Sequence, residues 1–137
     1  MMQFKLKESK IIKLLLTPTD EDNELSDSED TLFDYTARKI DNRDFSIIFD
    51  FRYKHLENIN LRLNYQVIFE SDSDLPESLE GNKFIYINAP AIAYPFLRAA
   101  VANIFLQSGY SPIMLSSINF QRLGNKKIEK MQSVKSN

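Results

Sequence analysis

Two stretches of alternating apolar and polar residues constrain the fold more than any other part of the chain. In residues 45–53 every odd position is apolar, and the same alternation returns in residues 59–69 after a short polar turn. A period of two places alternate side chains on opposite faces of a β-strand, so the pattern predicts an antiparallel hairpin with one apolar face. A single hairpin cannot bury such a face, so further strands and a covering layer must complete the fold.

Two weaker strand patterns precede the hairpin. Residues 4–16 have apolar side chains on both parities, for which we expect either a bulge or a strand covered on both faces. Pro18 ends this run, and residues 31–40 form a second, weaker strand that leads into the turn residues 41–43, Asp-Asn-Arg. Together with the hairpin, these strands predict a four-stranded antiparallel sheet.

The segment between the first two strands, residues 20–30, is strongly acidic. Seven of its residues are Asp or Glu, although the net charge of the whole chain is only -2. We interpret it as a solvated loop, with a docking surface for a basic partner as the alternative. The acidic balance argues against binding to a nucleic acid backbone, which requires many Lys and Arg residues, and the lysines of the C-terminal tail are too sparse to reverse it.

The composition is that of an ordinary folded protein. With 137 residues, 43% of them hydrophobic and 26% charged, the chain is expected to form a single domain over residues 1–137. The absence of cysteine excludes disulfides and thiolate sites and fits the cytoplasm. We find no signal peptide at the N-terminus and no later run of membrane-spanning length, so membrane insertion is not expected.

A helix that is unusually apolar follows the strands. We expect it to run from residue 91 or 94 to Ser108 and to end at Gly109 in a left-handed conformation. Its apolar residues extend nearly all round, which indicates burial on more than one side. One face can pack on the sheet, and we expect a second subunit to cover the other. The alternative is a helix buried wholly within one chain.

The remaining segments are less regular. Residues 79–87 fit either a short helix or a short strand, and residues 110–120 form an extended apolar loop. A last helix is expected over residues 120–132, with Gly124 as an internal weakness of about 1 kcal/mol. Residues 133–137 are expected to form a flexible tail.

The chain offers few groups for catalysis. His55 is the only histidine, and its place in a hairpin turn predicts an exposed side chain rather than a catalytic one. The three glycines are scattered, which excludes phosphate-binding loops, and neither a metal site nor a cofactor is indicated. The chain is therefore not expected to be an enzyme, although a small-ligand-binding or enzymatic α+β oligomer is kept as an alternative.

Apolar side chains on the loop and the last helix, next to the edge of the sheet, predict a groove instead. Such a groove binds extended polypeptide with little sequence demand, because apolar contact is non-directional and edge-strand backbone groups add hydrogen bonds. The alternative is that these residues complete the core of the monomer. The candidate groove residues are Leu32, Phe33, Tyr35, Tyr110, Ile113, Met114, Leu115, Ile118, Phe120 and Leu123.

Two motifs in this region resemble the SecB family of protein-export chaperones. They are residues 88–98, Asn-Ala-Pro-Ala-Ile-Ala-Tyr-Pro-Phe-Leu-Arg, and residues 109–120, Gly-Tyr-Ser-Pro-Ile-Met-Leu-Ser-Ser-Ile-Asn-Phe. The resemblance implies an α+β fold, with a four-stranded antiparallel sheet backed by a long helix and a short C-terminal helix. It also implies a homotetramer, a dimer of dimers, with the long helices between the sheets.

The resemblance further implies a function. It predicts a cytoplasmic holdase that binds unfolded preproteins and needs neither nucleotide nor metal. The holdase would deliver these preproteins to SecA, the motor of the Sec translocase. Acidic residues of the sheet and loops would face SecA. The groove maps to residues 110–120 and Leu123, and Arg98 and its neighbours map to the interface between helices. The predicted interface residues are Tyr94, Arg98, Ala102, Asn103, Phe105 and Leu106.

The chain also departs from the family pattern. Gln121 and Arg122 stand in place of an acidic residue and an alanine, and the tail contains lysines where family tails tend to be acidic. These differences weaken the expectation that the tail docks to the motor. Some divergent members of the family serve toxin–antitoxin systems, so a chaperone dedicated to an antitoxin is the alternative function.

Overall fold

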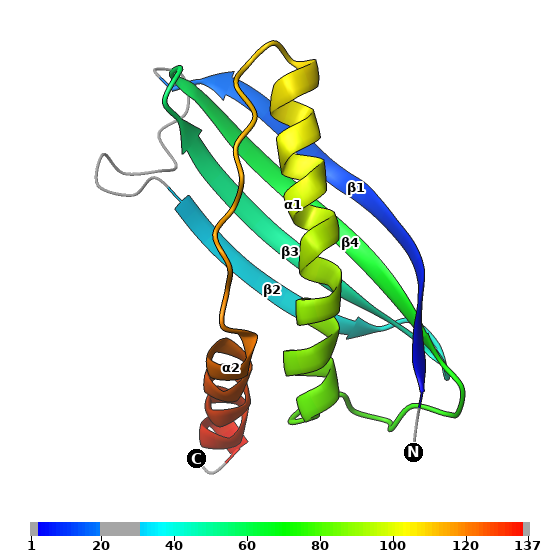
Figure 1. Ribbon diagram of the computed structural model, residues 1–137. Coiled ribbons are helices and arrows are strands. Elements are labelled where there is room, and N and C mark those ends of the chain that lie inside the picture. Colours follow the sequence, from blue (N-terminus) through cyan, green and yellow to red (C-terminus); the bar gives the residue numbers. More distant parts are fainter. Residues whose placement is uncertain (1–2, 20–30, 136–137) are drawn as a thin grey trace.

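The fold has two layers, a four-stranded sheet and a layer of helices on one of its faces (Figure 1). The computed structural model describes residues 3–19 and 31–135. The elements, in chain order, are β1 (Phe4–Pro18), β2 (Thr31–Lys39), β3 (Asp44–His55), β4 (Ile59–Ser71), η1 (Phe84–Asn88), α1 (Ala89–Gln107) and α2 (Phe120–Lys135). This arrangement confirms the predicted fold class.

Two of the predictions concern the acidic segment and the C-terminal end of the chain. The acidic segment, residues 20–30, lies outside the described residues, as do residues 136 and 137 of the expected tail. The boundary predicted for the last helix was wrong, because α2 continues to Lys135 and residues 133–135 are helical.

The sheet is antiparallel with the order β1-β4-β3-β2, so β1 and β2 are its edges. The turn between β2 and β3 is closed by Asp41, whose Oδ1 accepts the N–H groups of Arg43 and Asp44 at 2.9 and 2.8 Å. The turn between β3 and β4 places Asn58 at a φ of 62°, a left-handed conformation that Asn tolerates better than most residues. Both turns lie where the sequence predicted them.

The mixed parity of β1 is explained by bulges. The pairing of β1 with β4 shifts register between Leu6 and Glu8 and again between Ile11 and Lys13. Each shift inserts one extra residue and exchanges the faces of those that follow. The expectation of a bulge in this strand is therefore confirmed.

The core lies between α1 and the inner face of the sheet. The buried stripe of α1 follows the helical period through Ala93, Leu97, Val101 and Phe105. It packs against side chains of β3 and β4 that are almost fully buried, namely Phe45, Ile47, Phe49, Phe51, Leu61, Leu63, Val67 and Phe69.

The start of the long helix differs from the prediction. A turn of π-helix, η1, leads directly into α1, so the helical segment begins ahead of residue 91. Of the two alternatives left open for residues 79–87, residues 84–87 adopt the helical one. Pro90 lies in the first turn of α1, where a missing N–H is tolerated, and Pro95 lies inside the helix. Gly109 ends the helix with a φ of 92°, as predicted.

Helix α2 packs against η1 through a close approach at Gly124. Asn119 caps the helix, because its Oδ1 accepts the N–H of Arg122 at 3.0 Å. A Cβ atom added to Gly124 would lie 2.4 Å from Ile87 Cγ1 and 2.5 Å from the backbone oxygen of Tyr86. The prediction treated Gly124 only as a weakness of the helix, whereas its missing side chain permits the two helices to touch.

We therefore expect the variant Gly124→Ala to be less stable, although alanine is the better helix former by about 1 kcal/mol. The backbone oxygen of Tyr86 cannot move aside, so α2 must shift away from η1, at a loss of about 1 to 3 kcal/mol. Urea unfolding measures the loss, and hydrogen exchange locates it in α2. The exposed Gln121 on the same helix provides the control Gln121→Ala, which should not lower the stability of the protein. A Gly124→Ala protein that is more stable than the wild type would contradict the packing argument.

Candidate functional site

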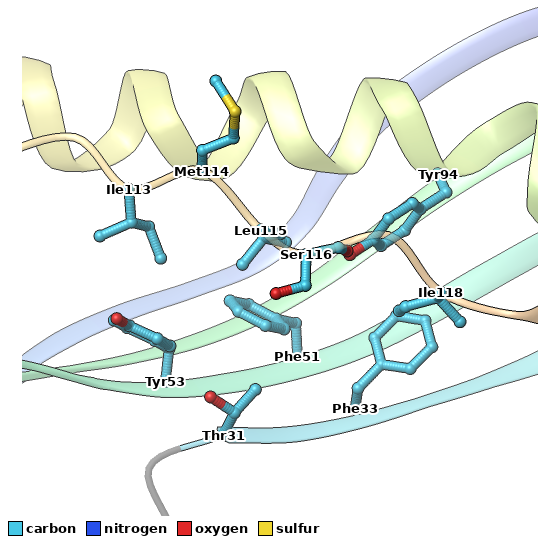
Figure 2. Close-up of a pocket in the computed structure, with 10 residues that line it drawn as sticks. All are labelled: Thr31, Phe33, Phe51, Tyr53, Tyr94, Ile113, Met114, Leu115, Ser116 and Ile118. Carbon is cyan, nitrogen blue, oxygen red and sulfur yellow. The ribbon is translucent and has the colours of Figure 1, made fainter.

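A cavity opens between the edge of the sheet and the segment that joins α1 to α2, residues 108–119, which we call the connecting segment (Figure 2). It has a volume of about 370 Å³, with strands β2 and β3 forming its floor and the segment at residues 113–118 forming one wall. The lining is largely aromatic and aliphatic and consists of Thr31, Phe33, Phe51, Tyr53, Tyr94, Ile113, Met114, Leu115, Ser116 and Ile118. An opening of this kind accepts apolar side chains with few directional demands.

A second hollow lies on the other side of the same segment. It has a volume of about 270 Å³ and is lined by α1, through Pro95, Arg98, Ala99 and Ala102, together with Ile113 and Met114. Those last two residues line both hollows. Met114 is 85% exposed, and Figure 2 shows its side chain directed away from the sheet. The connecting segment therefore offers apolar contacts on both of its sides.

The connecting segment is fastened to the rest of the fold through its backbone. The N–H of Ser111 donates to Glu57 Oε2 at 2.9 Å, and the Ser111 carbonyl oxygen lies 2.9 Å from His55 Nε2. Farther along, the hydroxyl of Tyr94 donates to the carbonyl oxygen of Ser116 at 2.6 Å. These hydrogen bonds hold the segment above the sheet at two points.

The environment of His55 overturns the prediction that it is an exposed turn residue. Its side chain is buried, and the ring centroid lies 4.7 Å from that of Phe105. Because Nδ1 accepts the N–H of Glu57 at 3.0 Å, the proton of the neutral ring lies on Nε2 and is donated to Ser111. Nε2 thus holds the segment between α1 and α2, and Nδ1 holds the turn between β3 and β4 that carries Glu57.

The structure gathers only part of the predicted groove residues around the cavity. Phe33, Ile113, Met114, Leu115 and Ile118 line it. Tyr110 packs against His55 instead, and Leu123 is partly buried on α2.

Three other predicted groove residues lie elsewhere. Tyr35 and Phe120 are buried behind Phe33, where the rings of Tyr35 and Phe120 meet with centroids 5.7 Å apart. Leu32 pairs with Arg52 in the register and therefore points to the opposite face of the sheet. Tyr35 and Phe120 thus complete the core, which was the alternative. Leu32 lies outside the cavity and lines, together with Phe33, a separate hollow at the edge of the sheet.

The sequence reasoning missed the aromatic floor of the cavity. Phe51 and Tyr53 lie on the inner face of β3, opposite Phe33 and Thr31 of β2. The period-two pattern had already placed Phe51 and Tyr53 on the apolar face, so pairing the two strands through their turn would have found them. Tyr94 had been assigned to an interface between subunits.

Buried tyrosines at this site keep their hydroxyl protons. Burial raises the pKa of Tyr94, and the nearby Arg98 opposes this only in part. Burial, together with the negative charge of Asp34, raises the pKa of Tyr35 to about 12, and its hydroxyl donates to the backbone oxygen of Tyr86 at 2.6 Å. Both phenols are therefore hydrogen-bond donors rather than acids at neutral pH.

The outer face of α1 is apolar although nothing in the described chain covers it. Ile92, Phe96 and Leu106 have exposed fractions of 48%, 44% and 59%. With Ala99 and Asn103 they form a stripe along the helix, which we call the α1 outer stripe. This arrangement contradicts the alternative that the helix is buried wholly within one chain.

The predicted interface residues divide between the two faces of α1. Asn103 and Leu106 belong to the α1 outer stripe, and Ala102 and Arg98 are partly buried beside it. Tyr94 and Phe105 are buried against the sheet, so they support the helix from inside and do not offer a surface to a partner.

The helical segment as a whole is also long and apolar enough to cross a membrane. The segment Phe84–Gln107 has 24 residues, and its most apolar window has a mean hydropathy of 1.4. The expectation that no run reaches membrane-spanning length was therefore wrong by length and composition. In the structure 44% of that window is buried, as in a core helix that packs on a sheet.

No metal site is formed by the described residues, since no three His, Cys, Asp or Glu side chains among them are grouped closely enough. Among the described residues that line the cavity of Figure 2, apolar side chains prevail and there is no carboxylate, histidine or lysine.

The tethering of the connecting segment leads to a test. In the variant Glu57→Ala the amide of Ser111 loses its charge-assisted hydrogen bond, worth about 1.5 to 3 kcal/mol. We expect its hydrogen exchange to accelerate by about tenfold or more, with global stability little changed because Glu57 is exposed. The neighbouring Leu56, 95% exposed, provides the control Leu56→Ala. An unchanged exchange rate would show that the tether does not hold the segment.

The family model and the curated relatives that match this chain point to one family. The family model described as "Preprotein translocase subunit SecB" matches residues 28–131. The chain is 34% identical over 73 residues to the protein-export protein SecB of Roseobacter denitrificans, a match that covers 53% of this chain and 43% of that protein. It is 34% identical over 59 residues to the same protein of Anaplasma phagocytophilum, covering 43% of this chain and 37% of that one.

Two solved structures share the fold. The first, with a TM-score of 0.60 and 11% identity, is a Mycobacterium tuberculosis SecB-like chaperone in complex with a peptide from an antitoxin; the match covers 84% of this chain and 90% of that one. The second, with a TM-score of 0.57 and 9% identity, is a protein of unknown function from Streptococcus agalactiae, covering 85% and 99%. In sequence, the chain spans less than half the length of the two curated relatives above.

Proposed function

The chain belongs to the SecB family, and we propose that it is an ATP-independent chaperone that binds unfolded preproteins in the cytoplasm. The observation that supports this function most directly is the apolar cavity under the connecting segment, with the exposed Met114 beside it. We propose that residues 110–118 and Phe33 contact the client, while Tyr35, Phe120 and Leu123 support the site from within. Strand β2 is an edge strand, so a client lying along it gains backbone hydrogen bonds that require no particular sequence.

Transfer of the client to a SecA-type motor is part of the proposal. Family membership supports it, and the curated relatives are named protein-export proteins. In a binding measurement, we expect a SecA-type motor to bind the client-loaded form of this protein more tightly than the empty form.

A second function, service to a single antitoxin, is favoured by one comparison. The Mycobacterium tuberculosis chaperone that shares this fold was solved with a peptide from an antitoxin. A toxin–antitoxin pair encoded next to this chain, and tight binding to that antitoxin alone, would favour the second function over general export.

We propose no catalytic role. A hollow with a charged lining lies at the other end of the sheet, where Lys7 bonds to Asp44 at 2.7 Å and Arg43 approaches Asp74 at 3.4 Å. The carboxylates there serve ion pairs, and His55 lies at the other end of β3. An activity that disappears in His55→Ala, with the fold intact, would favour an enzyme instead.

We propose that the protein assembles as a homotetramer, a dimer of dimers. Burial of a large apolar side chain is worth about 1.5 to 3 kcal/mol, and the α1 outer stripe exposes three of them. Edge strand β1 exposes two more on the inner face of the sheet, Ile11 and Leu14. Two uncovered apolar surfaces on different elements match the two interfaces that a dimer of dimers requires.

The chaperone function predicts that the wild-type protein, at a stoichiometric ratio and without ATP, suppresses aggregation of a chemically unfolded protein. The variant Met114→Asp should weaken client affinity by about tenfold, because a carboxylate would have to be desolvated against an apolar client. Met114 is largely exposed, so the fold should survive, and Leu56→Asp provides a control at an equally exposed site away from the cavity. Full holdase activity in Met114→Asp would contradict the proposed contact surface.

The assembly predicts a sedimentation result. The double variant Phe96→Asp, Leu106→Asp should reduce the molecular mass in solution, because two charges would face the partner's apolar stripe. The exposed Gln107 on the same helix provides the control Gln107→Asp, which should keep the wild-type mass. A wild-type protein that sediments only as a monomer at micromolar concentration would refute the interface.

A further inference from the structure

The methionines of this chain differ in how far their sulfur atoms are exposed to solvent. Met114, in the connecting segment, is 85% exposed, whereas Met131 of α2 is partly buried against the core. Met1 and Met2 lie outside the described residues. A peroxide reaches an exposed thioether more readily than a buried one, so Met114 is expected to be oxidised ahead of Met131.

Sulfur chemistry in this protein depends on methionine alone. The sequence contains four methionines and no cysteine. A cysteine thiolate would compete for a peroxide and could form a disulfide in response to it. Because the chain offers no such group, its response to a peroxide at sulfur takes place on thioethers.

Met114 lies where the two apolar hollows meet. It lines both the cavity under the connecting segment and the hollow on α1. Figure 2 shows its thioether directed away from the floor of the cavity, which Phe51 and Tyr53 form, whereas the adjacent Ile113 and Leu115 are more deeply buried. A client side chain in either hollow would therefore contact Met114.

Oxidation would change this contact from apolar to polar. The sulfoxide oxygen accepts hydrogen bonds, which water provides as long as the side chain of Met114 is exposed. A client that covers the sulfoxide removes this water, and apolar client side chains offer no donor in its place, so the client binds less tightly. The hydrogen bonds that hold the connecting segment use backbone atoms of Ser111 and Ser116, so oxidation of Met114 should leave the segment in place.

We propose that Met114 is a site of reversible oxidation that lowers the affinity of this protein for its clients, an inference that rests on the proposed chaperone function. A lone pair of the thioether sulfur attacks one oxygen of hydrogen peroxide, so that the S–O bond forms and the O–O bond breaks. The hydroxyl proton passes to the departing oxygen, which leaves as water. Sulfur is oxidised by one electron pair and the peroxide is reduced by it.

Methionine sulfoxide reductases reverse this step. A thiol pair supplies the electron pair and becomes a disulfide, and the sulfoxide oxygen leaves as water. Because each reductase acts on one epimer of the sulfoxide, complete reversal requires both enzymes, MsrA and MsrB.

The test treats the whole protein with dilute hydrogen peroxide, removes the peroxide and then adds a probe client, reduced and carboxymethylated α-lactalbumin labelled with fluorescein. Mass spectrometry of proteolytic fragments should show an added oxygen atom on Met114 sooner than on Met131. Fluorescence anisotropy should show that the affinity for the probe falls by about tenfold, because a polar group would be covered without a partner. Treatment with MsrA, MsrB and a thiol should restore the affinity.

Each variant is compared with its own untreated form. In Met114→Leu, peroxide should leave the affinity for the probe unchanged, although the other methionines are still present and can be oxidised. In Met131→Leu, peroxide should weaken binding as it does in the wild type. Untreated Met114→Gln, whose amide is polar as the sulfoxide is, should bind about as weakly as the oxidised wild type.

The proposal would be overturned by unchanged or tighter binding once Met114 is fully oxidised. It would also be overturned if Met131 were oxidised first, or if peroxide weakened Met114→Leu as much as the wild type. A wild-type protein that does not bind the probe before treatment would refute the chaperone function, and the effect proposed for oxidation with it. The two kinds of failure are distinct, because the second is seen in protein that has met no peroxide.

Discussion

A single helix is too narrow to cover the apolar face of a four-stranded sheet, and the rest of the structure follows from that mismatch. Neighbouring strands lie about 4.8 Å apart, whereas a helix with its side chains is about 10 Å wide. Helix α1 packs over the central strands β3 and β4 through Ala93, Leu97, Val101 and Phe105. The inner-face margins along β1 and β2 must therefore be covered by something else.

The margins along β2 and β1 differ in what covers them. Along β2 the chain returns as the connecting segment and α2, which leave the aromatic cavity between Phe33, Tyr53 and Ile113. Along β1 only the first residues are covered, where Phe84 of η1 stacks on Phe4. Ile11 and Leu14 remain exposed although they lie on the inner face, opposite Tyr65 and Leu63. The first margin supports the proposed client site, and the second supports the proposed assembly.

The sequence predicted the sheet well because period-two alternation is a local pattern, which each strand shows whatever the rest of the chain packs against it. It failed where burial depends on distant parts of the chain. His55 occupies a turn, but the connecting segment folds back over it and buries it, which no local pattern records. Gly124 looks unfavourable in a helix until the approach of Tyr86 is known. Leu32, in contrast, was predictable, since the alternation already separates its face from that of Phe33.

The hydrogen bonds that hold the connecting segment affect how the sequence of this segment can evolve. Its hydrogen bonds to His55, Glu57 and Tyr94 all use backbone atoms of Ser111 and Ser116, not their side chains. At the proposed client site, substitutions of Ile113, Met114 or Ile118 would therefore change which polypeptides are preferred while these backbone hydrogen bonds remain. The position of the segment would then evolve separately from the client preference that we propose for it, and a single mutation would be enough to change that preference.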